Sequence, residues 1–268
     1  PIQNLVRTFS QLIAIQANIE RLTGLLATES DVTDTKEVVE MYGDVFHPKR
    51  ENFEPLCGDV EFRDVSFHYP DGEEMVLSHF NLKVPRGTNV AIVGETGAGK
   101  STLANLVCRF YEPTGGEILI DGRDVRERSQ MWLHSNIGCV LQTPHLFSGS
   151  VRENLRYGKP NATDEEIWQA LDLVSAGDVV RRMEHGLDSE VGEGGDLLSL
   201  GEKQLLSFAR ALLSDPRILI LDEATASVDT VTEKKIQNAI RKIIQGRTSF
   251  VIAHRLSTVV DADVILVV

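Results

Sequence analysis

Apolar positions recur along this chain at two different spacings, and the change comes near residue 56. Within residues 1–30 they lie three or four positions apart, which places one apolar stripe along an amphipathic helix. The stripe consists of Leu5, Phe9, Leu12, Ile15, Ile19, Leu22 and Leu26. Such a helix packs either on its own domain or on partner helices outside this sequence. Residues 31–55 are acidic and polar, and they are expected to form a linker.

Beyond residue 56, short apolar runs alternate with helical periodicity. Residues 60–67 alternate apolar and polar side chains as a half-exposed strand does. Other runs are almost wholly apolar, as buried parallel strands require, and they comprise 89–93, 137–141, 218–221 and 250–253. Helical periodicity is present at residues 164–173 and 232–244. Strands that alternate with helices predict an α/β fold with a mostly parallel sheet.

Composition narrows the classes of function. The 268 residues are 42% hydrophobic and 25% charged, which is ordinary for a globular protein. The net charge of -13 argues against a general nucleic-acid or anionic-membrane surface. No run approaches the ~20 apolar residues that a membrane-spanning helix needs, so the chain as given is expected to be soluble. The cysteines are Cys57, Cys108 and Cys139. They are scattered and lack metal-ligand spacing, so they are expected to be reduced thiols.

A glycine-rich segment follows the apolar run at 89–93 and fits the P-loop, or Walker A, pattern GxxxxGK[ST]. Glycines let successive backbone N–H groups turn toward one point, and the next helix directs its positive dipole end there. Lys100 adds a charge for the β- and γ-phosphates, and the Ser101 hydroxyl can ligate Mg²⁺. The predicted nucleotide contacts are Gly94, Glu95, Thr96, Gly97, Ala98, Gly99, Lys100, Ser101 and Thr102.

An acidic pair ends the apolar run at 218–221 and supplies the carboxylates that such a site needs. Asp222 is placed to hold Mg²⁺ as the Walker B aspartate. Glu223, one residue further, is placed to polarise the attacking water as a general base. Alone, the pair could merely cap the following segment; with a P-loop upstream it predicts an ATPase site.

Residues 198–204, LSLGEKQ, resemble the LSGGQ signature of ABC transporter ATP-binding domains, and the sequence down to Asp229 is similar to that family throughout. Ser199 and Gly201 open a helix, so a hydroxyl, backbone amides and a helix dipole can meet a phosphate. The resemblance implies that this phosphate belongs to ATP held by an opposite subunit. Leu200 replaces the usual glycine, and Glu202 replaces the usual glutamine and adds negative charge near the nucleotide.

The resemblance implies roles for four more residues. Tyr69 corresponds to the aromatic residue that stacks on adenine, and Gln142 to the Q-loop glutamine that touches Mg²⁺ or the attacking water. Asp229 lies in a segment similar to the D-loop, which crosses the dimer interface. His254 corresponds to the switch histidine that contacts the γ-phosphate.

Other segments resemble exporters rather than importers. Residues 146–155 are similar to the exporter stretch after the Q-loop, and residues 189–195 to the exporter X-loop, with Gly194 where arginine is common. The amphipathic helix is similar to the cytosolic extension of the last transmembrane helix of an exporter.

The sequence therefore predicts a P-loop NTPase core with a mostly parallel sheet, a small antiparallel β subdomain and an α-helical signature subdomain at about 147–198. Residues 1–30 are expected to extend a missing transmembrane helix, and residues 31–55 to form the linker. Residues 56–268 are expected to form the ABC ATPase domain, truncated at its C-terminus inside a strand.

The resemblance implies a motor domain of a multidrug or lipid-like half-transporter that binds ATP and Mg²⁺. It would pair with a second ABC ATPase domain, identical or different, and act through transmembrane domains at the cytoplasmic face of the plasma (inner) membrane. Two alternatives stay open. One is a non-transport ABC ATPase that acts on nucleic acid or ribosomes, which the acidic charge disfavours, so no nucleic-acid partner is expected. The other is a nucleotide sensor without turnover, which Glu223 and His254 disfavour.

Overall fold

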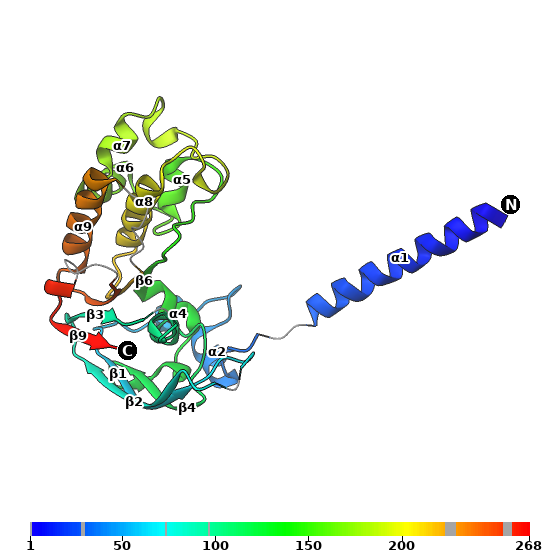
Figure 1. The fold of residues 1–268 in the computed structure, drawn as a ribbon, viewed down its shortest axis with the longest axis horizontal. Coiled ribbons are helices and arrows are strands. Elements are labelled where there is room, and N and C mark those ends of the chain that lie inside the picture. Colours follow the sequence, from blue (N-terminus) through cyan, green and yellow to red (C-terminus); the bar gives the residue numbers. More distant parts are fainter. Residues whose placement is uncertain (1, 28–29, 73, 96, 223–228, 254–258) are drawn as a thin grey trace. The chain divides into compact units, whose positions relative to one another are not determined.

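The computed structural model describes the chain except residues 1, 28–29, 73, 96, 223–228 and 254–258. It divides into two units, Pro1–Thr33 and Asp34–Val268 (Figure 1). The first unit contains the helix α1 (Ile2–Leu26), and several of its apolar residues are more than half exposed, among them Ile15, Ile19 and Leu22. Among the described residues, no helix is long and apolar enough to cross a membrane.

A five-stranded sheet lies at the centre of the second unit, and every pair of neighbouring strands in it is parallel. In spatial order its strands are β6 (Ile137–Val140), β7 (Ile218–Asp222), β8 (Thr248–Ile252), β3 (Asn89–Val93) and β9 (Val264–Val267). All five residues of β8 are buried, as are the first four of β7, which explains their continuous apolar sequence. The predicted parallel sheet is confirmed.

A second, antiparallel sheet covers part of this core. In spatial order its strands are β2 (Leu77–Val84), β1 (Val60–Phe67), β4 (Gly115–Ile120) and β5 (Arg123–Asp124). One face of β1 is buried and the other is not, which matches the apolar–polar alternation of its sequence. The predicted small antiparallel sheet is confirmed.

Helices pack around the two sheets, and those from α5 to α9 gather on one side of the unit (Figure 1). The helices are α2 (Lys36–Tyr42), α3 (Lys100–Val107), α4 (Gln130–Asn136), α5 (Val151–Arg156), α6 (Asp164–Leu173), α7 (Gly177–Arg181), α8 (Leu200–Leu213) and α9 (Thr230–Ile244). Short 3-10 turns occur at Arg50–Asn52, Val125–Glu127, Gly186–Asp188 and Glu193–Gly195.

Strand β7 separates two hydrophobic cores because its side chains alternate between the faces of the sheet. Leu219 and Leu221 belong to the core that the helices α5 to α9 build. Ile218 and Ile220 belong to the other core, which joins α3 and α4 to the antiparallel sheet. The parallel sheet therefore joins α3 and α4 on one side to the helices α5 to α9 on the other.

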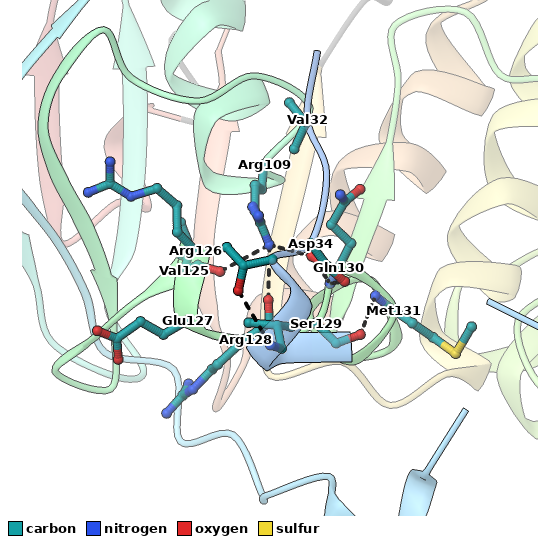
Figure 2. A network of polar contacts seen from close by, with 12 residues as sticks. Val32, Asp34, Arg109, Val125, Arg126, Glu127, Arg128, Ser129, Gln130 and Met131 are labelled. Carbon is teal, nitrogen blue, oxygen red and sulfur yellow. Dashed lines mark hydrogen bonds and ion pairs between the residues drawn. The ribbon is translucent and has the colours of Figure 1, made fainter. Parts of the chain in front are cut away.

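Residues from Asp34 onward pack into the second unit, where the sequence indicated a linker. Figure 2 shows the tie: Arg109 Nη1 donates to Asp34 Oδ1 at 2.8 Å and to the Arg128 carbonyl oxygen at 2.9 Å. The backbone N–H of Gln130 donates to Asp34 Oδ2 at 3.1 Å, and the Arg109 side chain is 1% exposed. Glu112 accepts from Arg109 Nε at 3.0 Å. One buried guanidinium thus joins the segment before α2 to the core.

Candidate functional site

The glycine-rich loop runs from the end of β3 into α3 and is shaped for close approach by an anion. Gly97 and Gly99 have φ angles of 88° and 95°, which only glycine adopts without strain. A Cβ on Gly99 would also lie 2.9 Å from Val76 Cγ1. Gly99 is the N-cap of α3, so the positive end of that helix opens into the loop.

Lys100 places a buried positive charge inside this loop. Its side chain is 8% exposed, and Nζ donates to the carbonyl oxygens of Gly94 at 3.0 Å and Glu95 at 2.6 Å. Both acceptors are neutral, so they satisfy the ammonium's hydrogen bonds without cancelling its charge. The loop, the helix dipole and Lys100 together fit a phosphate group, and Ser101, the second residue of α3, is exposed.

Two further predicted residues of this half-site lie at the same edge of the sheet. Asp222 is the last residue of β7, and Gln142 is exposed two residues beyond the end of β6. Because β6, β7 and β3 are parallel, their carboxyl ends meet where the glycine-rich loop begins. Asp222 and Gln142 therefore share this edge with Ser101, and a carboxylate, an amide and a hydroxyl are oxygen ligands that suit Mg²⁺.

Tyr69 lies beside α3. Its hydroxyl is hydrogen-bonded to Thr102 Oγ1 at 2.8 Å, and its ring makes edge contacts with Phe67 and Tyr111 at centroid distances of 5.0 and 5.2 Å. This hydrogen bond fixes the aromatic ring beside the first turn of α3, next to the glycine-rich loop. It also occupies the Thr102 hydroxyl, so this side chain has a structural role that the sequence did not indicate.

Ser199 is the N-cap of α8, the helix that carries the signature. The Ser199 hydroxyl donates to Glu202 Oε2 at 2.9 Å, and the Ser199 backbone N–H donates to the same oxygen at 3.0 Å. Arg182 Nη2 lies 3.4 Å from the other carboxylate oxygen of Glu202. Gly201, in the first turn, is buried. The substituted position Glu202 is thus part of a reciprocal helix cap.

Asp229 is the N-cap of α9, and its Oδ1 accepts from the backbone N–H groups of Val231 and Thr232, each at 3.0 Å. A hydrogen bond with the Thr232 side chain, and after it the bonds from the backbone N–H groups of Thr232 and Val231, hold the pKa of Asp229 below its usual range. Three predicted site residues, Thr96, Glu223 and His254, lie outside the described residues.

A groove of about 670 Å³, which the sequence did not reveal, is lined by residues of α4, β6 and α8 and of the segments on either side of α5. Its lining includes the exposed aromatic residues Phe147 and Tyr157. Arg210 also lines it, and its Nη1 is buried with no hydrogen-bond partner among the residues that the structure describes. Burial lowers the pKa of this guanidinium. Exposed aromatic residues beside an arginine are typical of a protein contact surface.

Comparison with known proteins places these features in a family. The family model described as ABC transporter matches residues 77–226. The chain is 43% identical over 268 residues to the Bacillus subtilis protein named "Uncharacterized ABC transporter ATP-binding protein YfiC", covering 100% of this chain and 42% of that protein. It is 46% identical over 267 residues to "Probable multidrug resistance ABC transporter ATP-binding/permease protein YheH" of the same organism, covering 100% of this chain and 37% of that protein.

A solved structure agrees. "Structure of a bacterial Atm1-family ABC exporter with ATP bound" matches 94% of this chain and 42% of its own chain, with a TM-score of 0.80 and 37% sequence identity. This chain thus spans about two fifths of the length of these relatives.

Proposed function

Because this chain belongs to the ABC transporter family, whose ATP-binding domains are ATPases, we propose that it binds and hydrolyses Mg-ATP to power export across a membrane. The observation that carries the proposal is the buried Lys100 ammonium, held by two neutral carbonyl oxygens at the N-terminus of α3. A buried charge with neutral partners favours an anionic ligand, and the N-terminus of a helix beside it favours phosphate oxygens.

Each half-site residue has a distinct task. The backbone N–H groups of the loop and Lys100 bind the β- and γ-phosphates. Tyr69, whose ring is held by edge contacts with Phe67 and Tyr111, stacks on adenine. Ser101, Gln142 and Asp222 hold Mg²⁺, which neutralises charge on the phosphates. Glu223 and His254, which follow β7 and β8 in the sequence, have catalytic roles.

Glu223 accepts the proton of the attacking water, and His254 donates to the γ-phosphate. Both positions follow strands of the parallel sheet, β7 and β8, whose carboxyl ends meet at the phosphate loop. Their positions in the sequence, just after these strands, support the roles, because the general base must reach the attacking water and the histidine must reach the γ-phosphate.

The second half of the site comes from another copy or a related domain. Ser199 and Gly201 at the start of α8 contact the γ-phosphate held by the opposite domain, and Asp229 lies at the interface. The dimer closes when ATP binds and opens after hydrolysis. In each domain the groove lined by Phe147, Tyr157 and Arg210 binds a transmembrane domain at the cytoplasmic face of the membrane. The helices of that transmembrane domain convert closure of the dimer into transport.

Phosphate release tests this function. The purified chain should hydrolyse ATP only with Mg²⁺, and its rate per molecule should rise with protein concentration because two domains make each site. Chelation of Mg²⁺ should abolish turnover. No hydrolysis at a protein concentration high enough to dimerise the chain would contradict the proposal, as would a rate per molecule that is independent of concentration.

A further inference from the structure

The helices α5, α6 and α8 begin with the same reciprocal cap. In each, the side chain of the N-cap residue accepts from the third helical N–H, and the glutamate there accepts from the N-cap N–H. The pairs are Ser150 with Glu153, Thr163 with Glu166, and Ser199 with Glu202. The first two pairs lie outside the signature, whereas the third uses the signature serine itself.

At α8 the cap engages both hydrogen-bond donors of Ser199. The hydroxyl donates to Glu202 Oε2 at 2.9 Å, and the backbone N–H donates to the same atom at 3.0 Å. In return the Glu202 N–H donates to Ser199 Oγ at 3.3 Å. The positive end of the α8 dipole favours a carboxylate in this place. A phosphate oxygen that approaches Ser199 therefore meets a hydroxyl whose proton is already donated.

The charge of Glu202 adds to this effect. Its side chain is 27% exposed, and its other oxygen lies 3.4 Å from Arg182 Nη2, whose side chain is 70% exposed. An ion pair so open to water is weak and leaves the carboxylate negative. Glu202 thus opposes a phosphate at Ser199 in two ways, by holding its donors and by its own charge.

We propose that Glu202 is a positioning residue that withholds the Ser199 hydroxyl from ATP held by a second copy, so that each closure of the dimer must first break the Ser199–Glu202 hydrogen bond. This inference rests on the proposed function, since it concerns ATP bound between two domains. It implies that the chain needs more ATP to dimerise than the same chain with a neutral residue here.

Glu202→Gln tests this directly. Glutamine can also complete the cap, so α8 still starts at the same residue, but the negative charge is gone. With Glu223→Gln added to every protein to prevent turnover, Glu202→Gln should lower the ATP concentration for half-maximal dimerisation about tenfold. That factor is about 1.4 kcal/mol, the change expected when the hydrogen bond of the Ser199 hydroxyl to a charged carboxylate becomes a weaker one to a neutral amide oxygen. Sedimentation during an ATP titration measures it.

The chain offers a matched control. Glu166→Gln makes the same substitution in the cap of α6, where Lys159 takes the place of Arg182 as the cation. It should leave the half-maximal ATP concentration unchanged. A second control is Ser199→Ala, which removes the hydroxyl: in that background Glu202→Gln should give a much smaller gain, because no hydroxyl remains to be released.

The outcomes separate the two claims. A Glu202→Gln protein that dimerises at the parent's ATP concentration, at a higher one or not at all overturns the role of Glu202. So does a tenfold gain that persists in full with Ser199→Ala, or an equal gain from Glu166→Gln. ATP binding to the monomer, followed by calorimetry, should be equal in all these proteins. If the parent chain binds no ATP in the calorimetry experiment, the proposed function is refuted instead.

Discussion

Lys100 is the side chain on which the proposed nucleotide binding depends most. Lys100→Ala removes the buried charge while the glycine-rich backbone stays in place. ATP affinity measured by calorimetry should fall by about 2 kcal/mol or more, the size of a lost charge-assisted hydrogen bond.

Lys159→Ala is the control for that experiment because Lys159 makes an ion pair with Glu166 on the surface. Its removal should leave ATP affinity unchanged. Equal affinities of the parent and the Lys100→Ala protein would mean that the loop from Gly94 to Ser101 does not hold the phosphates.

The role of a single residue was predictable where a short sequence motif contains that residue. The P-loop spacing indicated the place of Lys100, but not that carbonyl oxygens of Gly94 and Glu95 hold it. The S-x-x-E spacing of Ser199 and Glu202 is a capping-box pattern and could have revealed their hydrogen bonds. The buried Arg109 carries no such signal, because one of its carboxylate partners precedes it by 75 residues.

Arg109 holds the segment before α2 to the core, and the loss of this contact should measurably destabilise the fold. Arg109→Leu should lower the free energy of unfolding by about 3–5 kcal/mol, since it leaves Asp34 and Glu112 beside an apolar side chain. Leucine also has a Cβ, so the positive φ of 54° at this position is equally strained in both proteins. Urea denaturation measures the loss.

Arg63→Leu is the matched control. Arg63 is 51% exposed and makes ion pairs with Glu61 and Glu117 on the antiparallel sheet. Its loss should cost less than about 1 kcal/mol, because exposed ion pairs contribute little. If both substitutions destabilise the chain equally, the buried tie does not hold the segment to the core.

Helices and strands with a clear pattern of apolar residues were predictable from the sequence. Very short elements, and those that depend on pairing with another strand, were not. Strands β7 and β8 are continuous apolar runs because both of their faces are buried, so the sequence alone indicated them. Helix α2 has seven residues, too few for a helical period to stand out in a polar segment. The two-residue strand β5 exists only through its pairing with β4.

Helix α1 forms a unit of its own, and its removal should affect association rather than folding. Burial of one apolar side chain contributes about 1.5–3 kcal/mol, so exposed residues such as Ile15, Ile19 and Leu22 favour contact between copies. Deletion of residues 1–30 should leave the melting temperature of the rest nearly unchanged and reduce self-association.

Replacement of Ile15, Ile19 and Leu22 by glutamine provides the control, because it keeps the helix and removes only its apolar surface. It should reduce self-association as the deletion does, measured by light scattering without nucleotide. A large fall in melting temperature on deletion would mean that α1 belongs to the folded core.

The whole molecule is proposed to work as a pair of domains closed by ATP, and Glu223→Gln tests this most directly. Without its general base the chain should still bind ATP through the loop of Lys100 but should not hydrolyse it. Sedimentation with Mg-ATP should then show a stable dimer that the parent forms only transiently, and turnover should be abolished. A Glu223→Gln protein that stays monomeric with saturating Mg-ATP, or that hydrolyses ATP at the parent's rate, would contradict the account.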